Sequence, residues 1–374
     1  MESDRKNKRN QTFQYLEALI ILMVIDDHVS TRIGILSSVF PYNSFYMPFL
    51  VFISGYFYNK KSIGDYLVHK GKRLLIPYLL WNIVGNGIAY ILMRRGIVNW
   101  YCGINLKSLM YCFVSGPLSS VNGPSWFVIM LFYVSVLYNV IRNILKKEKL
   151  SIDIGLLMGC ALIGCASLIL CMRGYNRGLY LPILRGAFYL QFYHLGYFFR
   201  RYLEGYLRRL DKMKVCFLCI GFNLILICLY GDKINFYSTS TMGSFNFWYL
   251  PLITSVIGMT FWYEIMSYLS EKIGQSRYID FIAENTFTIM ETHLLFANIP
   301  NFYVLFRIKN GSSNFPDFDI QKFVGSAWFR YNGNARLVGF FCGVGGSLLT
   351  VYLMKLVKVR FIHMRSQSRM TGVK

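Results

Sequence analysis

Charged residues are scarce in this chain. Asp, Glu, Lys and Arg together make up 16% of the 374 residues, whereas 55% of the residues are hydrophobic and no third of the sequence lacks long apolar runs. Apolar runs of about 20 residues are typical of helices that cross a lipid bilayer. The composition therefore predicts an all-α, polytopic membrane helical bundle, and no stretch has the character of an additional soluble domain.

Several nucleotide and metal motifs are missing. The sequence has no G-x-x-x-x-G-K-S/T loop, no G-x-G-x-x-G after a strand and no H-E-x-x-H, so an internal NTPase, a dinucleotide fold and a zincin are unsupported. The nine cysteines are scattered. Cys216 and Cys219 form a C-x-x-C inside an apolar run without a second pair, which favours packing over zinc or redox chemistry. A disulfide between Cys102 and Cys112 is an alternative to two free thiols. We expect no metal.

Acidic residues are few, with 18 Asp and Glu against 40 Lys and Arg, which gives a formal net charge of +22. Of the basic residues, 27 fall in the tails and in alternate connections, 12 fall in the other connections, and Arg185 lies inside an apolar run. By the positive-inside rule, the tails and the basic connections face the cytoplasm. Membrane topology thus explains the net charge, and we expect no nucleic-acid partner, since no basic soluble segment is present to bind one.

A window of about 20 residues finds ten membrane spans. The first is retained and is not a cleaved signal peptide, because it is long, contains charges and has no small-residue cleavage pattern after it. No internal repeat is visible, which weakens the inverted-repeat arrangement of many secondary transporters. We treat residues 1–374 as one membrane domain with basic cytoplasmic tails at 1–13 and 358–374. The spans are 14–36, 43–59, 74–93, 124–142, 151–172, 179–199, 214–230, 248–268, 279–304 and 336–357.

The first apolar run carries ionisable side chains: Glu17 near its start, then Asp26, Asp27 and His28. An Asp, Lys or Arg inside a bilayer costs about 2.5 to 3.5 kcal/mol on insertion scales, so such groups usually face protein or water and have a function. Eleven residues separate Glu17 from His28, so they share one helix face, about 16 Å apart along the axis. Asp27 and His28 diverge by about 100° around the helix, so a direct triad contact between them would need a local distortion.

Further polar residues lie at membrane depth in later spans. If the ninth span enters from the cytoplasm near residue 279, His293 lies about 21 Å along it, and His28 lies at a similar height on the first. The two histidines are thus expected at one level of the bundle. The alternative for each is an interior polar contact without a catalytic role, but the two carboxylates before His28 favour function there. The full set is His28, Arg185, His194, Glu264, Glu284, Glu291 and His293.

Several motifs follow one another along the chain. The first helix ends in His28, and residues 45–57 (FYMPFLVFISGYF) contain Met-Pro, a Phe-rich run and Ser-Gly-Tyr. Residues 70–78 (KGKRLLIPY) carry a basic run before Pro-Tyr, residues 125–127 (SWF) a Trp-Phe, and residues 285–293 (NTFTIMETH) are similar to Ser-x-x-x-Tyr-x-x-His. In this order and spacing, the motifs resemble those of the membrane acyltransferase family 3.

The resemblance implies acyl transfer, usually of an acetyl group from cytoplasmic acetyl-CoA to a hydroxyl of a cell-envelope carbohydrate. A neutral imidazole can take the hydroxyl proton as the acceptor attacks the thioester, so His28, together with Asp27, is the expected catalytic site. Lys70, Lys72 and Arg73 are expected to bind the phosphates of CoA, with positive-inside anchoring as the alternative. The expected substrate-binding residues are Glu17, Ser54, Tyr56, Trp126, Glu291 and His293.

One position departs from the family pattern. The family commonly has Arg eleven residues before the His, where this chain has Glu17. A carboxylate repels phosphate, so we expect Glu17 to pair with a cation such as Arg73 and not to touch the donor.

The expected partners are acyl-CoA, membrane lipids and a carbohydrate acceptor, either a free sugar or a lipid-linked or growing exopolysaccharide repeat unit. Because the sequence ends 17 residues after the last span, acyl groups are expected to go directly to the acceptor or to a separate protein. The alternative function is a proton-coupled transporter or flippase of envelope glycans, with His28, Glu291 and His293 as a proton relay.

The distribution of basic residues predicts a multi-pass protein of the cell membrane with both termini in the cytoplasm. The long connections at 94–124 and 307–335 then lie outside and are expected to cover or line an outer mouth. A reporter that is active only in the cytoplasm should be active when fused after Lys374 and silent when inserted within 94–124. The reverse pattern would invert the topology, and a silent reporter at both positions would place the C-terminus outside and remove a span from the count.

Overall fold

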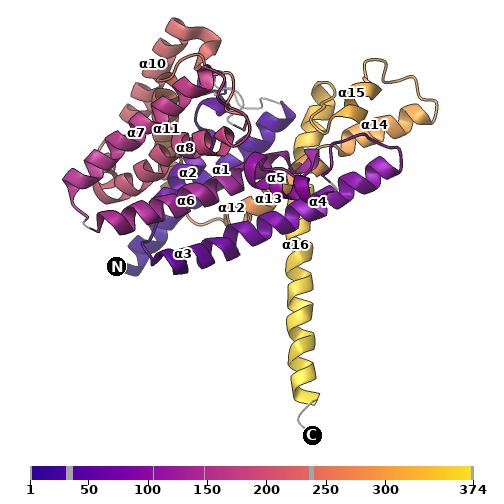
Figure 1. Ribbon diagram of the computed structural model, residues 1–374, viewed down its shortest axis with the longest axis horizontal. Coiled ribbons are helices and arrows are strands. Elements are labelled where there is room, and N and C mark those ends of the chain that lie inside the picture. The colour runs from indigo at the N-terminus through magenta and orange to yellow at the C-terminus, as the bar shows by residue number, and fades with distance from the viewer. Residues whose placement is uncertain (1, 31–36, 104, 147, 236–239, 372–374) are drawn as a thin grey trace.

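The structure, a computed structural model, describes residues 2–30, 37–103, 105–146, 148–235 and 240–371 (Figure 1). These residues form helices and loops without any strand, and Cys102 and Ser119 make one isolated antiparallel bridge among them. The predicted all-α membrane bundle is confirmed. The α-helices, with 3₁₀ or π-helical turns labelled η, are α1 (Glu2–Val29), η2 (Tyr42–Ser44), α2 (Tyr46–Tyr56), α3 (Ile63–Lys70), η3 (Gly71–Leu75), α4 (Ile76–Arg94), α5 (Leu106–Ser115), η4 (Ser120–Ser125), α6 (Trp126–Leu145), α7 (Leu150–Met172), α8 (Tyr180–Phe198), η5 (Phe199–Leu203), α9 (Glu204–Leu207), α10 (Lys212–Tyr230), η6 (Gly231–Ile234), α11 (Leu250–Ile273), α12 (Arg277–Ala283), α13 (Thr286–Phe296), α14 (Ile299–Lys309), α15 (Ile320–Gly325) and α16 (Gly333–Thr371).

Helix lies at each of the ten predicted spans, although two differ from a simple crossing. The second, α2, has 11 residues and is about 16 Å long, shorter than the hydrocarbon core of a bilayer at about 30 Å. The ninth was expected as one helix over 279–304, and this prediction is wrong: α12, α13 and α14 replace it. Pro300 in the first turn of α14 lacks an N–H, which suits the start of a new helix. The expected end of the first span, 31–36, lies outside the described residues.

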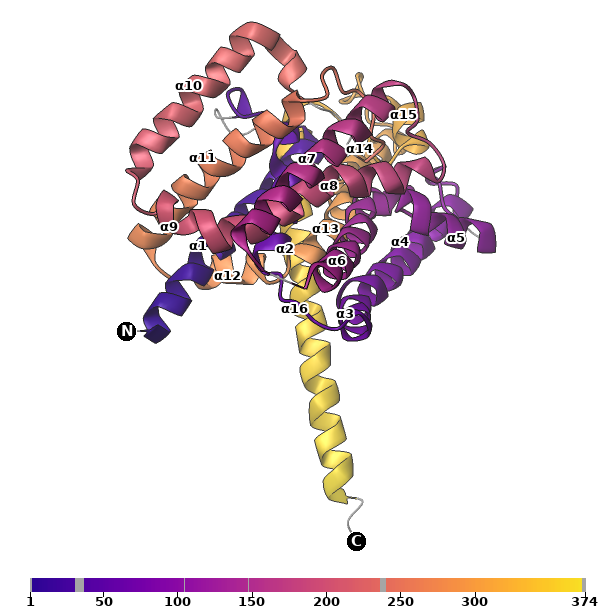
Figure 2. The same ribbon diagram turned by 60° about the vertical axis from the view of Figure 1, so that its left-hand side comes forward.

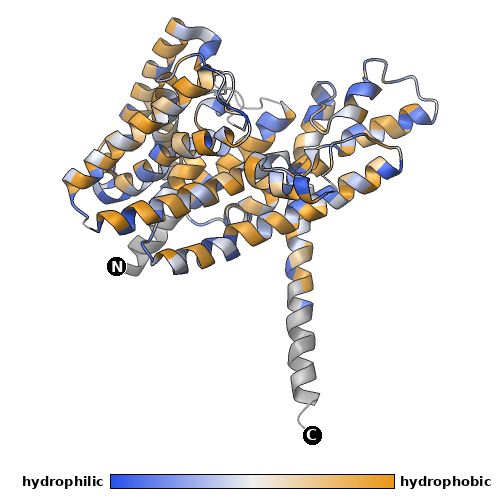
Figure 3. Ribbon diagram, in the orientation of Figure 1, coloured by the Kyte–Doolittle hydropathy of each residue, from blue (hydrophilic) through white to orange (hydrophobic). Residues whose placement is uncertain are grey.

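Apolar surface covers the outside of the bundle (Figure 3). Large exposed apolar side chains lie on α4, α7, α10 and α16, for example Leu80, Leu162, Phe217 and Phe341. Lipid tails can cover such apolar faces without a cost in free energy, whereas exposing these faces to water is unfavourable. In the described part of the chain, five helical stretches are long and apolar enough to cross a membrane by length and composition: Ile63–Arg94, Ser120–Leu145, Leu150–Met172, Lys212–Ile234 and Asn334–Val357.

Helix α1 runs through the middle of the bundle and contacts α2, α11, α12, α13 and α16 (Figure 2). Its apolar side chains are almost all buried, including Leu16, Ile20 and Ile25. A central position explains why ionisable residues on this helix are tolerated, since they face protein. The helix therefore carries its polar residues directly into the interior.

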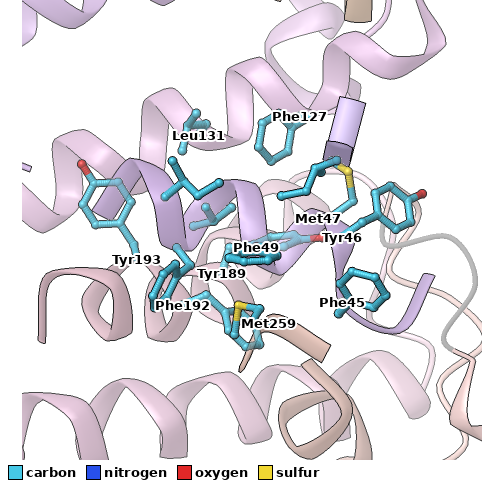
Figure 4. Close-up of a cluster of buried hydrophobic side chains, with 14 of the residues drawn as sticks. Phe45, Tyr46, Met47, Phe49, Phe127, Leu131, Tyr189, Phe192, Tyr193 and Met259 are labelled. Carbon is cyan, nitrogen blue, oxygen red and sulfur yellow. The ribbon is translucent and has the colours of Figure 1, made fainter. Parts of the chain in front are cut away.

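Helix α2 is short because it is enclosed by other helices. Figure 4 shows its side chains among those of α6, α8 and α11, including Phe49, Phe127, Phe192 and Met259. Two glycines let α2 and α8 approach through their main chains. A Cβ at Gly55 would lie 1.8 Å from the carbonyl oxygen of Tyr193, and one at Gly196 would lie 2.0 Å from that of Phe52. Small residues at such crossings are typical of membrane helices, where close packing drives association.

A buried ion pair joins α6 to α7. Arg142 and Asp153 form a salt bridge with both side chains almost inaccessible, and Arg142 Nη2 donates to the hydroxyl of Tyr197 on α8 at 2.8 Å. In the connection between α6 and α7, Glu148 pairs with Arg201, and this hydrogen bond lowers the pKa of Glu148. These contacts tie three helices together at one end of the bundle.

Both ends of the described chain project from the same side of the bundle, α1 by its first turns and α16 by its long second half (Figures 1 and 2). This arrangement is compatible with termini in one compartment. The identity of that compartment remains the prediction made from the charges.

A second, smaller apolar core lies where α4 meets α14 and α15. Its largest members are Trp100, Phe318, Phe323 and Tyr331. This core supports the connection between α15 and α16.

The main-chain contact between α2 and α8 predicts a sharp difference between two glycines of α8. Gly196→Ala should lower the thermal stability of the purified protein by about 1 to 3 kcal/mol, because the added Cβ forces the helices apart. Gly186→Ala on the same helix has nothing within 4 Å of the new Cβ and should be neutral or slightly stabilising. Equal melting temperatures for the two variants would show that the helices separate at no cost.

Candidate active site

His28 lies in the last turn of α1 and contacts a second histidine. Its Nδ1 is 2.8 Å from Nε2 of His293 on α13, and the ring planes differ by 14°. The two histidines predicted at one level of the bundle are therefore in direct contact. Helix α16 packs closely against both partners, since a Cβ at Gly343 would lie 3.3 Å from Ile25 of α1 and from the carbonyl of His293.

Hydrogen-bond partners assign the tautomers of this pair. Nδ1 of His293 is 3.0 Å from the carbonyl oxygen of Ile289, which can only accept, so this nitrogen carries a proton. In a neutral His293 ring, Nε2 is then the acceptor, and Nδ1 of His28 donates to it. Nε2 of His28 keeps its lone pair. The pair thus holds His28 in the form that can accept a proton at Nε2.

A loop at residues 326–332, between α15 and α16, packs on His28. The rings of Trp328 and His28 meet at 89° with centroids 5.0 Å apart. Arg330 Nε donates to the backbone carbonyl of His28 at 3.0 Å, which places a cation at the C-terminal end of α1, where carbonyls lack helical partners. Burial lowers the pKa of Arg330 to about 10, so the guanidinium is protonated at neutral pH.

Sequence reasoning did not single out Trp328 or Arg330, because a loop has no periodicity to reveal which side chains point inward. The available signal was a Trp and an Arg two residues apart in a connection expected to line the outer mouth. A Cβ at Gly123 would lie 2.3 Å from the indole of Trp328, so the glycine of η4 gives this ring its place.

Asn298, at the break between α13 and α14, ties the loop to the histidine pair. Its Oδ1 accepts from Arg330 Nη1 at 3.2 Å and from Asn301 Nδ2 at 3.0 Å. Its Nδ2 donates to the carbonyl of Ala327 at 2.9 Å. The break between α13 and α14 therefore lies next to the histidine pair and the loop that packs on it.

Asp27 lies beside His28 without occupying its Nδ1. Its Oδ2 accepts a hydrogen bond from the hydroxyl of Tyr46 at 3.2 Å, while Nδ1 of His28 bonds His293. A neutral imidazole thus stands where a serine-protease triad has its carboxylate. Asp26, the preceding residue, is buried.

Glu291 belongs to a neighbouring cluster. It lies two residues before His293, so the two side chains diverge by about 200° around α13. Its Oε2 accepts from the hydroxyl of Ser125 and lies 3.5 Å from Asn122 Nδ2, and its Oε1 is buried without a hydrogen-bond partner in the described residues. The structure therefore separates Glu291 from the histidine pair.

Three further expected residues have their own partners. The hydroxyl of Ser54 donates to the carbonyl of Leu50 within α2, and that of Tyr56 donates to Glu204 at 3.0 Å. Trp126 is buried beneath the guanidinium of Arg185, whose Cζ is 5.1 Å from the ring centroid. None of these contacts involves His28 or His293, so the structure does not join these residues to the pair.

The basic segment lies at the junction of α3, η3 and α4. Lys72 and Arg73 are exposed, and Lys70 is half-buried with its Nζ 5.5 Å from the ring centroid of Tyr66. Arg73 interacts electrostatically with Glu17 of α1. The two residues are not among the ion pairs within 4 Å that the described residues form, so the expected pairing of Glu17 with this segment stays a prediction.

A cavity of about 250 Å³ lies between α2, α8, α9 and α11, lined by Phe52, Phe199, Leu203, Val256, Tyr263 and neighbouring apolar residues. None of the expected site residues lines it.

In the described part of the chain, no group of three His, Cys, Asp or Glu could hold a metal ion. Cys102 and Cys112 are both free thiols, so the alternative of a disulfide between them is wrong.

Comparison with known families identifies the family of this chain. The family model described as an acyltransferase domain, that of membrane acyltransferase family 3, matches residues 10–356, which is nearly the whole chain. The match includes α1 with His28, α13 with His293 and the loop that carries Arg330. The curated proteins and the solved structures give no match.

The electrostatic contact between Glu17 and Arg73 predicts a measurable coupling. In a double-mutant cycle, Glu17→Gln and Arg73→Gln should couple by about 0.5 to 1 kcal/mol in thermal stability, a small value because Arg73 is exposed to water. The matched control is Lys72→Gln, one residue away, whose effect should add to that of Glu17→Gln. Coupling of the same size with both cations would mean that Glu17 responds to the net charge of the segment and not to Arg73.

Proposed function

Because the chain belongs to the membrane acyltransferase family 3, we propose that it transfers an acetyl group from acetyl-CoA to a hydroxyl of a cell-envelope carbohydrate. The observation that carries this proposal is the histidine pair, in which the hydrogen bond to His293 leaves Nε2 of His28 as a free acceptor. A positioned neutral imidazole can act as a general base for a hydroxyl group.

In the proposed reaction, the acceptor oxygen attacks the thioester carbonyl carbon while Nε2 of His28 takes the hydroxyl proton. The carbonyl electron pair moves to oxygen and forms a tetrahedral oxyanion. When the carbonyl re-forms, the carbon–sulfur bond breaks and the CoA thiolate leaves with the proton from His28. His293 keeps the ring of His28 oriented through both steps, as the hydrogen-bonded partner of a catalytic histidine does.

The donor is proposed to bind with its phosphates at Lys70, Lys72 and Arg73. Exposed basic side chains at one helix junction suit a polyanion. Glu17 contacts this segment electrostatically and shares a face of α1 with His28, about 16 Å further along the helix. This face of α1 is the proposed route by which the acyl group reaches the imidazole from the phosphate site.

The acceptor is proposed to be a carbohydrate hydroxyl, free or on a lipid-linked or exopolysaccharide repeat unit, which meets His28 on the outer side of the membrane. Trp328 supports this choice, since its half-exposed indole stands against His28 and offers an apolar face to a sugar ring. In this arrangement the protein is a multi-pass enzyme of the cell membrane with both termini in the cytoplasm.

The transporter hypothesis receives less support. It requires His28, His293 and Glu291 to form one relay, but the carboxylate of Glu291 binds Ser125 and Asn122 on the other side of α13. Radiolabelled acetyl-CoA added to native membrane vesicles, which contain the acceptor, distinguishes the two functions, because a transporter would release no CoA.

The proposal predicts that His28→Ala lowers acetyl transfer by about 10² to 10⁴-fold, the usual contribution of a general base. His293→Gln should lower it less, because an amide oxygen can still accept from Nδ1 of His28. Release of CoA from acetyl-CoA in native membrane vesicles, which contain the acceptor, measures both effects.

His194 provides the control. It is a buried histidine bonded to Tyr138 and to the carbonyl of Asp153, away from the pair, and His194→Gln should keep its turnover if the protein folds. Turnover of His28→Ala within a few-fold of the parent protein would end the proposal.

A further inference from the structure

Arg330 is a half-buried cation whose hydrogen bonds are incomplete. Its Nε binds the carbonyl of His28, and its Nη1 binds Asn298 Oδ1 and the carbonyls of Ala327 and Phe329, the last at 2.6 Å. Its Nη2 is buried and has no hydrogen-bond partner in the described residues. A guanidinium has five N–H donors, and a buried donor without an acceptor is costly.

No carboxylate neutralises this charge among the ion pairs of the described residues. Arg142 shows the usual solution in the same protein, since Asp153 pairs with it and a tyrosine hydroxyl accepts from its Nη2. A buried cation without a counter-charge is unfavourable unless an anionic group arrives. Arg330 therefore differs from Arg142 in two ways: it has no carboxylate partner among these ion pairs, and its Nη2 has no acceptor in the described residues.

The position of Arg330 Nη2 indicates what this free donor could bind. Arg330 is bonded to the backbone of His28, and its charge acts on the imidazoles of both His28 and His293. An oxygen bound at Nη2 would thus lie close to the end of α1 that carries His28. In acyl transfer, the oxygen that gains negative charge is the thioester carbonyl oxygen.

We propose that Nη2 of Arg330 donates a hydrogen bond to the acyl carbonyl oxygen and stabilises its negative charge in the tetrahedral intermediate. This proposal rests on the proposed function and adds a second catalytic residue to it. As the acceptor oxygen bonds to the carbonyl carbon, the carbonyl π electrons move to the oxygen that Arg330 holds. They return when the carbon–sulfur bond breaks and thiolate leaves. Nε and Nη1 hold the loop throughout, so the guanidinium does not move.

The test compares Arg330→Gln and Arg330→Lys with Arg336→Gln, using CoA release from acetyl-CoA in native membrane vesicles. Arg336 is the matched control, because its Nε donates to the carbonyl of Tyr331 and ties the same loop without touching His28. Both Arg330 variants should lose about 10² to 10³-fold in maximal rate, with the KM for acetyl-CoA within a few-fold of the parent value. Lysine retains the charge but cannot replace the guanidinium fork. Arg336→Gln should stay near the parent rate.

Added guanidinium ion should restore part of the rate of Arg330→Ala and none of the rate of His28→Ala. Three outcomes would overturn the proposal. The first is that both Arg330 variants keep rates within a few-fold of the parent. The second is a raised KM for acetyl-CoA or for the acceptor with an unchanged maximal rate, which would indicate ground-state binding of an anionic acceptor. The third is that Arg330→Lys and Arg336→Gln lose rate and melting temperature equally, which would indicate a structural loop contact. If His28→Ala is inactive while Arg330→Lys is active, only this inference fails, whereas an active His28→Ala removes the proposed function itself.

Discussion

A hydrogen bond between two imidazoles joins the first helix of the chain to α13 and sets the chemistry available at the end of α1. The bond has a direction because the carbonyl of Ile289 fixes the proton on His293, and the direction leaves one nitrogen of His28 free to accept. Interior position, tautomer and orientation of His28 all follow from this one contact. A mechanism that uses His28 as a base therefore depends on a helix more than 250 residues away in the sequence.

The broken ninth span lies next to the same site. At the break between α13 and α14, Asn298 presents its amide to the loop at residues 326–332 and gives Arg330 one of its acceptors. Asn298 and Asn301 satisfy two carbonyls of this loop, since their side-chain amides donate to the carbonyls of Ala327 and Phe329. The interruption thus lies where the bundle meets the loop at residues 326–332.

The sequence predicted the parts of the fold that depend on long apolar runs and on the free energy of burying ionisable side chains in a membrane. Long apolar runs predicted the bundle, and the expense of burying Asp26, Asp27 and His28 marked α1 as the helix that matters. A similar height along two helices predicted that His28 and His293 would lie at one level of the bundle, and the structure adds that they are in contact. The roles given to the site residues stay predictions, including that of Glu17.

Other features had little or no local signal. Arg330 and Trp328 lie in a loop, and their direction is set by the distant Gly123 and Asn298, which no pattern in the sequence connects to them. The break at Asn298 had one signal, Pro300 in the first turn of α14, which the apolar residues around it outweighed in a hydropathy window. The crossing of α2 and α8 has a further consequence. Carbonyls that touch glycine backbones cannot yield by rotating a side chain, so this pair forms a rigid wall on one flank of α1. Any passage that lets a thioester approach the imidazole from the opposite membrane face has to open elsewhere around that helix.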